Sequence, residues 1–158
     1  MKTLILAGGF GTRLGEYTHK IPKPMVPIGE FPILIHLMSL YAKSGHREFI
    51  VATGYKADII QQYFHDNSDH FVLKSDKQID FNFSIKYGNN KDNWKVTLLF
   101  TGENTMTGGR IKQAQSIIDD ESFFVTYGDG LSDVNIDRLL HHHKQHGRIA
   151  TVTAVRPP

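Results

Sequence analysis

The apolar residues of the chain form short runs that alternate with longer segments of mixed polarity. Residues 3–7 form a short apolar run that ends at a glycine. Such a run is typical of a central strand of a parallel sheet, buried on both faces. Strict alternation at residues 79–85 predicts a half-exposed strand or a hairpin. Further strands are predicted at Glu48–Thr53, Val96–Thr101, Ser122–Tyr127 and Ile149–Val155.

Segments with apolar residues at helical spacing lie between these strands. They predict helices at residues 32–41, with Pro32 as the first helical residue, and at 57–64, 110–118 and 135–146. Asp133 or Asn135 is expected to cap the last one. Strands that alternate with helices favour an α/β fold, a Rossmann-like three-layer sandwich with a mostly parallel central sheet. The chain stops after its last predicted strand, so we expect it to be the first part of something longer.

The composition fits one globular domain over residues 1–158. Hydrophobic residues make up 40% of the chain, and 18 basic against 16 acidic residues leave a net charge of +2. This balance argues against a general nucleic-acid or membrane surface. There are no cysteines, which excludes disulfides and thiolate metal sites. Without a membrane-length apolar run or a recognisable leader, the expected location is the cytoplasm.

A glycine-rich loop follows the first predicted strand. It runs from Leu6 to Leu14 and places three glycines within four positions. Such a backbone approaches a ligand closely, and its N–H groups can surround phosphate oxygens. The loop lacks the Lys-Ser/Thr of a P-loop and the third glycine of the dinucleotide fingerprint, but it offers Arg13 as a phosphate-binding cation. The alternative is a tight turn without a ligand.

Lys23 is held between two prolines, Pro22 and Pro24. Because proline fixes its own φ angle and restricts the residue before it, the ammonium group is expected to stay in one place. A fixed positive charge is useful where phosphates react. A basic surface loop is the alternative, and this motif alone favours that alternative.

Asp129 follows the apolar strand that ends at Tyr127 and lies between two glycines. Ligands of open α/β sheets bind at the carboxyl ends of the strands, where a carboxylate can hold Mg²⁺ beside a triphosphate. An Asp-Gly turn or a helix cap explains the residue equally well. Asp133 is a second, weaker candidate for either role.

The segment from Thr101 to Arg110 combines glycines, hydroxyl groups and an arginine before a predicted helix. It is suited to binding a base or a phosphate. A flexible connection capped by Thr107 is the alternative.

Together and in this order, these motifs resemble those of the sugar-phosphate nucleotidyltransferases. The first two motifs and Gly128-Asp129 are typical of the whole family. The segment 101–110 and the residues Trp94–Leu98 resemble the glucose-1-phosphate cytidylyltransferase branch. The resemblance covers essentially the whole chain.

The resemblance implies a role for each matching position. Arg13 would bind the CTP phosphates, Lys23 would lie near the α-phosphate and the incoming sugar phosphate, and Asp129 would bind Mg²⁺; these three are the expected catalytic residues. The expected nucleotide-binding residues are Leu6, Ala7, Gly8, Gly9, Phe10, Gly11, Thr12, Arg13, Lys23, Thr105, Arg110 and Gly128.

The resemblance also implies an activity, the transfer of a cytidylyl group from CTP to glucose 1-phosphate, and assembly as a homo-oligomer. The family's second metal-binding aspartate and most of its sugar pocket correspond to sequence beyond Pro158. Two alternatives remain open: a related transferase that uses UTP, dTTP or GTP, and a nucleotide-binding module without turnover.

Overall fold

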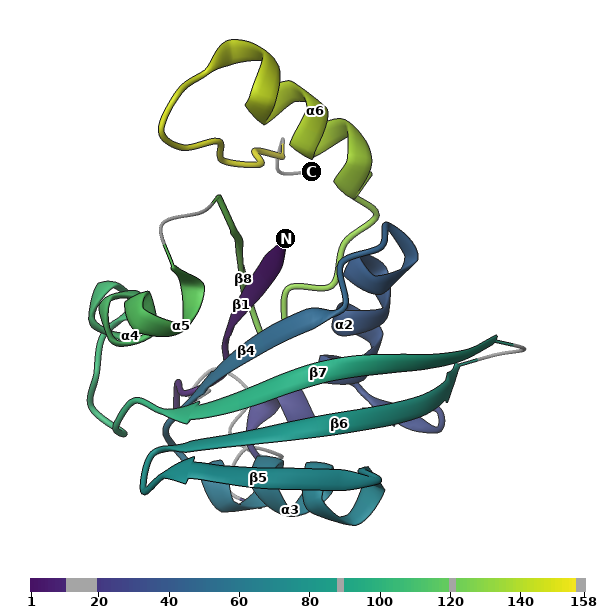
Figure 1. Ribbon diagram of the computed structural model, residues 1–158, viewed down its shortest axis with the longest axis vertical. Coiled ribbons are helices and arrows are strands. Elements are labelled where there is room, and N and C mark those ends of the chain that lie inside the picture. The colour runs from purple at the N-terminus through teal and green to yellow at the C-terminus, as the bar shows by residue number, and fades with distance from the viewer. Residues whose placement is uncertain (11–19, 88–89, 120–121, 156–158) are drawn as a thin grey trace.

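The computed structural model describes residues 1–10, 20–87, 90–119 and 122–155. Six strands form one sheet in the order β5-β6-β7-β4-β1-β8 (Figure 1). Strands β8, β1, β4 and β7 are mutually parallel, and β6 runs antiparallel to both of its neighbours. The six strands are β1 (Lys2–Leu6), β4 (Glu48–Thr53), β5 (His70–Ser75), β6 (Gln78–Tyr87), β7 (Asn90–Phe100) and β8 (Phe124–Tyr127).

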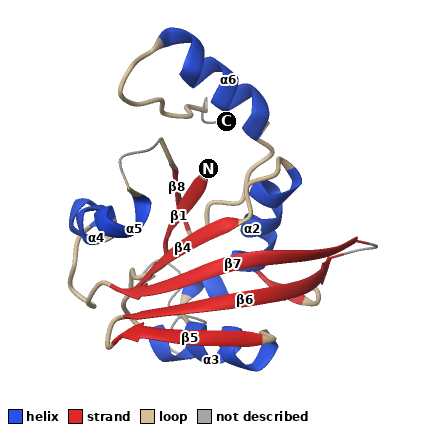
Figure 2. Ribbon diagram, in the orientation of Figure 1, coloured by secondary structure: helices blue, strands red, loops and turns tan. Residues whose placement is uncertain are grey.

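Helices cover both faces of the parallel part of the sheet (Figure 2). The remaining elements are a 3-10 turn η2 (Lys23–Met25), a small ladder of β2 (Pro27–Ile28) and β3 (Phe31–Pro32), and the helices α2 (Ile33–Lys43), α3 (Ala57–Asn67), α4 (Thr107–Gln113), α5 (Gln115–Ile118) and α6 (Ile136–His146). The predicted three-layer α/β fold with a mostly parallel sheet is confirmed. None of the described helices combines the length and apolarity needed to cross a bilayer.

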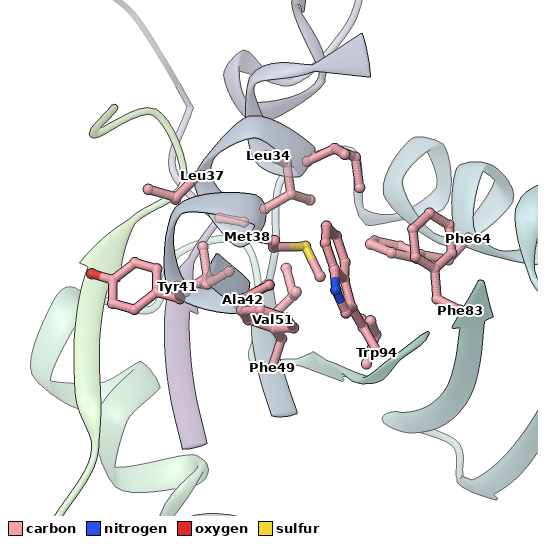
Figure 3. Close-up of a cluster of buried hydrophobic side chains, with 14 of the residues drawn as sticks. Leu34, Leu37, Met38, Tyr41, Ala42, Phe49, Val51, Phe64, Phe83 and Trp94 are labelled. Carbon is pink, nitrogen blue, oxygen red and sulfur yellow. The ribbon is translucent and has the colours of Figure 1, made fainter. Parts of the chain in front are cut away.

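The alternation of side chains along β1 explains why its second half, Leu4 to Leu6, is continuously apolar. Ile5 packs into a cluster with residues of α2 and α3, whereas Leu4 and Leu6 pack on the opposite face with Ala114, between α4 and α5, and with Ile118 of α5. The larger cluster contains the aromatic group of Phe49, Phe64, Phe83 and Trp94, together with Leu34, Leu37 and Met38 of α2 (Figure 3). Burial on both faces is typical of an interior strand, and β1 lies between β4 and the edge strand β8.

Several boundaries differ from those predicted. Pro32 is extended and precedes α2 rather than starting it. The single helix expected at 110–118 is two helices that meet at Ala114. Asn135, not Asp133, caps α6, because its side chain accepts a hydrogen bond from the backbone N–H of Arg138 at 2.9 Å.

The strand predicted at Ile149–Val155 is wrong. This segment pairs with none of the described strands, and Ile149, Val152 and Val155 are 83–103% exposed. Gly147 ends α6 with φ 61°, and Thr151 then contacts His143 and His146 through its hydroxyl group at 2.9 and 2.7 Å. β-branched residues favour a strand only where a neighbouring strand pairs with them, and here the segment lies beside α6 instead (Figure 1).

Candidate functional site

A cavity of about 710 Å³ lies where the parallel strands β1 and β8 end. Its walls come from the segment after β1, from η2, from the β7–α4 connection and from the end of β8. The lining residues are 6–10, 23–24, 103–107, 110 and 127–130. This is the edge at which open α/β sheets bind their ligands.

The first wall is the backbone that leaves β1. The N–H of Ala7 donates to Ala52 O at 3.0 Å, and the N–H of Gly128 donates to Leu6 O at 2.9 Å, so the neighbouring strands hold this backbone on both sides. Phe10 is 45% exposed, and its ring lies 5.2 Å from that of Tyr55. The predicted contacts of Gly11, Thr12 and Arg13 lie outside the described residues.

Lys23 and Asp129 meet at the wall formed by η2 and the end of β8. A Cβ atom added to Gly128 would lie 2.8 Å from Pro24 Cγ, so only glycine lets η2 approach the end of β8 this closely. The approach brings Lys23 Nζ into an ion pair with Asp129 Oδ2, with 31% and 30% of the two side chains exposed. A cation and a carboxylate thus line the same cavity.

Asp129 lies in the turn that ends β8, where the N–H of Gly130 donates to Tyr127 O at 3.1 Å. Within the described ranges, no three His, Asp or Glu side chains gather into a group that could hold a metal ion. Among the described residues, Asp129 could offer a cation one carboxylate ligand at the end of β8, with further ligands from substrate oxygens, water or residues outside the described ranges. Mg²⁺ commonly binds in this way.

The segment between β7 and α4 forms the remaining wall. Gly102 has a φ of 92°, a conformation that side chains disfavour, and it turns the chain towards the cavity. Thr105 Oγ1 donates to Thr101 O at 2.6 Å, which orders the turn. Met106 is 80% exposed at the cavity wall and provides apolar surface there.

Arg110 is the most buried charged side chain of the site, with 5% exposed. Nη1 donates to Thr53 O at 3.0 Å and to Thr101 Oγ1 at 2.5 Å. Nη2 donates to Gly8 O at 2.8 Å and to Glu103 O at 3.2 Å. Burial lowers the pKa of Arg110 from its ordinary value.

The cavity brings together every predicted site residue that the structure describes. These are Leu6, Ala7, Gly8, Gly9, Phe10, Lys23, Thr105, Arg110, Gly128 and Asp129. Their individual roles towards a ligand stay predictions. Seven further cavity residues were not expected individually: Pro24, Glu103, Asn104, Met106, Thr107, Tyr127 and Gly130. Their position within the sequence motifs was the available signal.

Two bacterial relatives match all or nearly all of this chain. The chain is 45% identical over 161 residues to the glucose-1-phosphate cytidylyltransferase of Salmonella typhimurium, with 100% of this chain and 62% of that protein covered. It is 44% identical over 156 residues to a probable glucose-1-phosphate cytidylyltransferase of Bacillus subtilis, with 98% and 60% covered. The chain thus spans about three-fifths of the length of these relatives.

A solved structure and a family model extend the comparison. The crystal structure of HddC from Yersinia pseudotuberculosis complexed with GMP-PN superposes with a TM-score of 0.62 at 29% identity, covering 90% of this chain and 53% of that one. The model of the family described as Nucleotidyl transferase matches residues 2–158. The chain therefore belongs to the nucleotidyl transferase family.

Proposed function

We propose that this chain is the nucleotide-binding part of an enzyme that transfers a cytidylyl group from CTP to α-D-glucose 1-phosphate, giving CDP-glucose and pyrophosphate. One observation carries the proposal: the segment after β1, Lys23, Thr105, Arg110 and Asp129 line a single cavity at the ligand-binding edge of the sheet. The names of the relatives at 45% and 44% identity support the choice of CTP and glucose 1-phosphate.

The reaction needs positioned charge rather than a general base. A phosphate oxygen of glucose 1-phosphate, already ionised, attacks the α-phosphorus of CTP; the new O–P bond forms as the bond to pyrophosphate breaks. Negative charge builds up on the equatorial and leaving oxygens. Lys23 would stabilise this charge, and Arg13 would bind the triphosphate.

Asp129 is suited to Mg²⁺ because it presents a carboxylate to the cavity beside Gly128 and Gly130. A bound Mg²⁺ supplies charge neutralisation for the phosphate oxygens. Lys23 pairs with Asp129 in the structure. We expect this pair to part when a nucleotide binds, so that Lys23 turns to the phosphates and Asp129 to the cation. The family's pattern further suggests assembly as a homo-oligomer and a product used in deoxysugar and O-antigen synthesis.

The base preference is testable by binding alone. We expect the 158-residue chain to bind CTP at least about tenfold more tightly than UTP, dTTP or GTP, because polar groups built for one base are left unpaired by another. Isothermal titration with the four nucleotides, each with Mg²⁺, measures this preference. Tighter binding of UTP or dTTP would mean that the base assignment is wrong.

Turnover is expected to need more sequence than these 158 residues. We expect little pyrophosphate release from this chain alone. We expect clear release from a chimera that continues past Pro158 with the corresponding part of the Salmonella typhimurium relative. A normal rate from the short chain would contradict this requirement. Should the chimera bind CTP without turnover, the alternative of a nucleotide-binding module would be favoured.

A further inference from the structure

The guanidinium of Arg110 joins three loops that are distant in sequence. Its acceptors lie after β1 (Gly8 O), at the end of β4 (Thr53 O) and after β7 (Thr101 Oγ1 and Glu103 O). Thr101 Oγ1 in turn donates to Thr53 O at 2.7 Å. Two of these loops, those after β1 and β7, form walls of the cavity.

The same contacts leave Arg110 little capacity to bind a ligand directly. Four of the five guanidinium N–H groups donate to described residues, and among the described acceptors none binds the Nε–H. No carboxylate among the described residues forms an ion pair with Arg110. Neutral oxygens, three from the backbone and one from the Thr101 hydroxyl, thus satisfy a buried charge. Turning the guanidinium towards a phosphate would leave those oxygens without this donor.

Two glycines make room for this group. A Cβ atom on Gly8 would lie 2.1 Å from Arg110 Nη1, and one on Gly54 would lie 2.6 Å from the same atom. The three atoms nearest to this Cβ at Gly8 all belong to the guanidinium, whereas those nearest at Gly54 include the carbonyl oxygens of Gly8 and Gly102 at 2.8 Å. Glycine at position 8 therefore leaves room for the Arg110 guanidinium. This requirement holds whether or not a ligand also approaches the backbone at Gly8.

We propose that Arg110 is a positioning residue that fixes the shape of the nucleotide cavity by joining the loops after β1, β4 and β7. It acts on the nucleotide through Gly8 and Glu103 rather than by pairing with a phosphate. This role towards the nucleotide rests on the proposed function, but the joining of the loops does not.

The joining of the loops is testable without any ligand. The N–H of Tyr55 donates to Gly8 O at 3.2 Å and that of Thr101 donates to Thr53 O at 3.0 Å, so both amides share an acceptor with Arg110. In Arg110→Met and in Gly8→Ala, we expect hydrogen exchange at both amides to accelerate by about tenfold or more, while amides in the middle of β1 and β4 keep their rates.

Gly108→Ala is the matched control, because a Cβ atom there meets nothing within 4 Å. Gly8→Ala keeps every donor of the guanidinium. If Tyr55 and Thr101 keep their native exchange rates in this variant, the proposal is overturned. This variant also keeps the test decisive if Arg110→Met fails to fold.

Affinities for cytidine and CTP then separate positioning from phosphate binding. Positioning predicts that Arg110→Met weakens both ligands by the same factor, and that adding Gly8→Ala causes little further loss. A loss at least about tenfold larger for CTP than for cytidine would overturn the proposal, since it would indicate direct phosphate contact. If the unaltered chain binds neither ligand, the proposed function fails, whereas the exchange result still decides whether Arg110 joins the loops.

Discussion

Replacing Lys23 with alanine lowers turnover more than about tenfold in the chimera that continues past Pro158, because the loss of one preorganised charge donor typically costs about 2.7–4 kcal/mol of transition-state stabilisation. Pro22 and Pro24 hold the ammonium at the cavity wall, and no other lysine lines the cavity among the described residues. Steady-state pyrophosphate release at saturating CTP measures the effect. A fall in kcat with unchanged KM would place the effect in the transition state.

A stability measurement and a control variant distinguish a catalytic effect of Lys23→Ala from a loss of folded structure. The Lys23–Asp129 pair is partly exposed, so its removal is expected to change the free energy of unfolding by no more than about 1 kcal/mol. Lys74→Ala, on the exposed strand β5 away from the cavity, serves as the matched lysine control. An unchanged rate in Lys23→Ala would remove Lys23 from the catalytic residues.

The strands buried on both faces were the part of the fold most accessible from the sequence. β1 and β4 are short and mostly apolar, a glycine follows each within two positions, and nearly every residue in them is buried. β5 was not predicted, because all its residues are exposed and it pairs with β6 alone among the described strands. Residues 149–155 show the opposite error, since their composition favours a strand that the described residues do not pair with. Local sequence carries propensity, whereas pairing depends on distant partners.

The candidate site shows the same difference between features that local sequence predicts and features that depend on distant contacts. The motifs predicted which residues gather at the sheet edge, because the ends of parallel strands meet there. They did not predict that Lys23 pairs with Asp129, since that contact depends on Pro24 packing against Gly128 across the fold. Nor did they predict that the donors of Arg110 bind backbone oxygens. A buried arginine and a phosphate-binding arginine look alike in a sequence, and only the acceptors around the guanidinium distinguish them.

The largest loss of stability is expected from Trp94→Ala, at about 3–5 kcal/mol, because truncation of a large buried aromatic residue leaves a cavity that the surroundings fill incompletely. Trp94 is 2% exposed, and its ring lies 5.5 Å from that of Phe49 and 5.8 Å from that of Phe83. Figure 3 shows the indole between Met38 of α2 and the pair Phe64 and Phe83. It therefore joins both helices of this layer to the sheet.

Urea unfolding followed by far-UV circular dichroism measures the loss; fluorescence is unsuitable because Trp94 is the only tryptophan. Trp94→Phe separates two contributions, since it keeps most of the buried area but removes the hydrogen bond from Nε1 to Asp92 Oδ2 at 3.1 Å. We expect this variant to lose about 1–2 kcal/mol. Leu73→Ala, at a side chain that is 64% exposed, is the control and should stay within about 0.5 kcal/mol of the unaltered chain. A loss below about 1 kcal/mol in Trp94→Ala would show that the aromatic cluster does not hold α2 and α3 to the sheet, because a cavity in a close-packed core costs more than that.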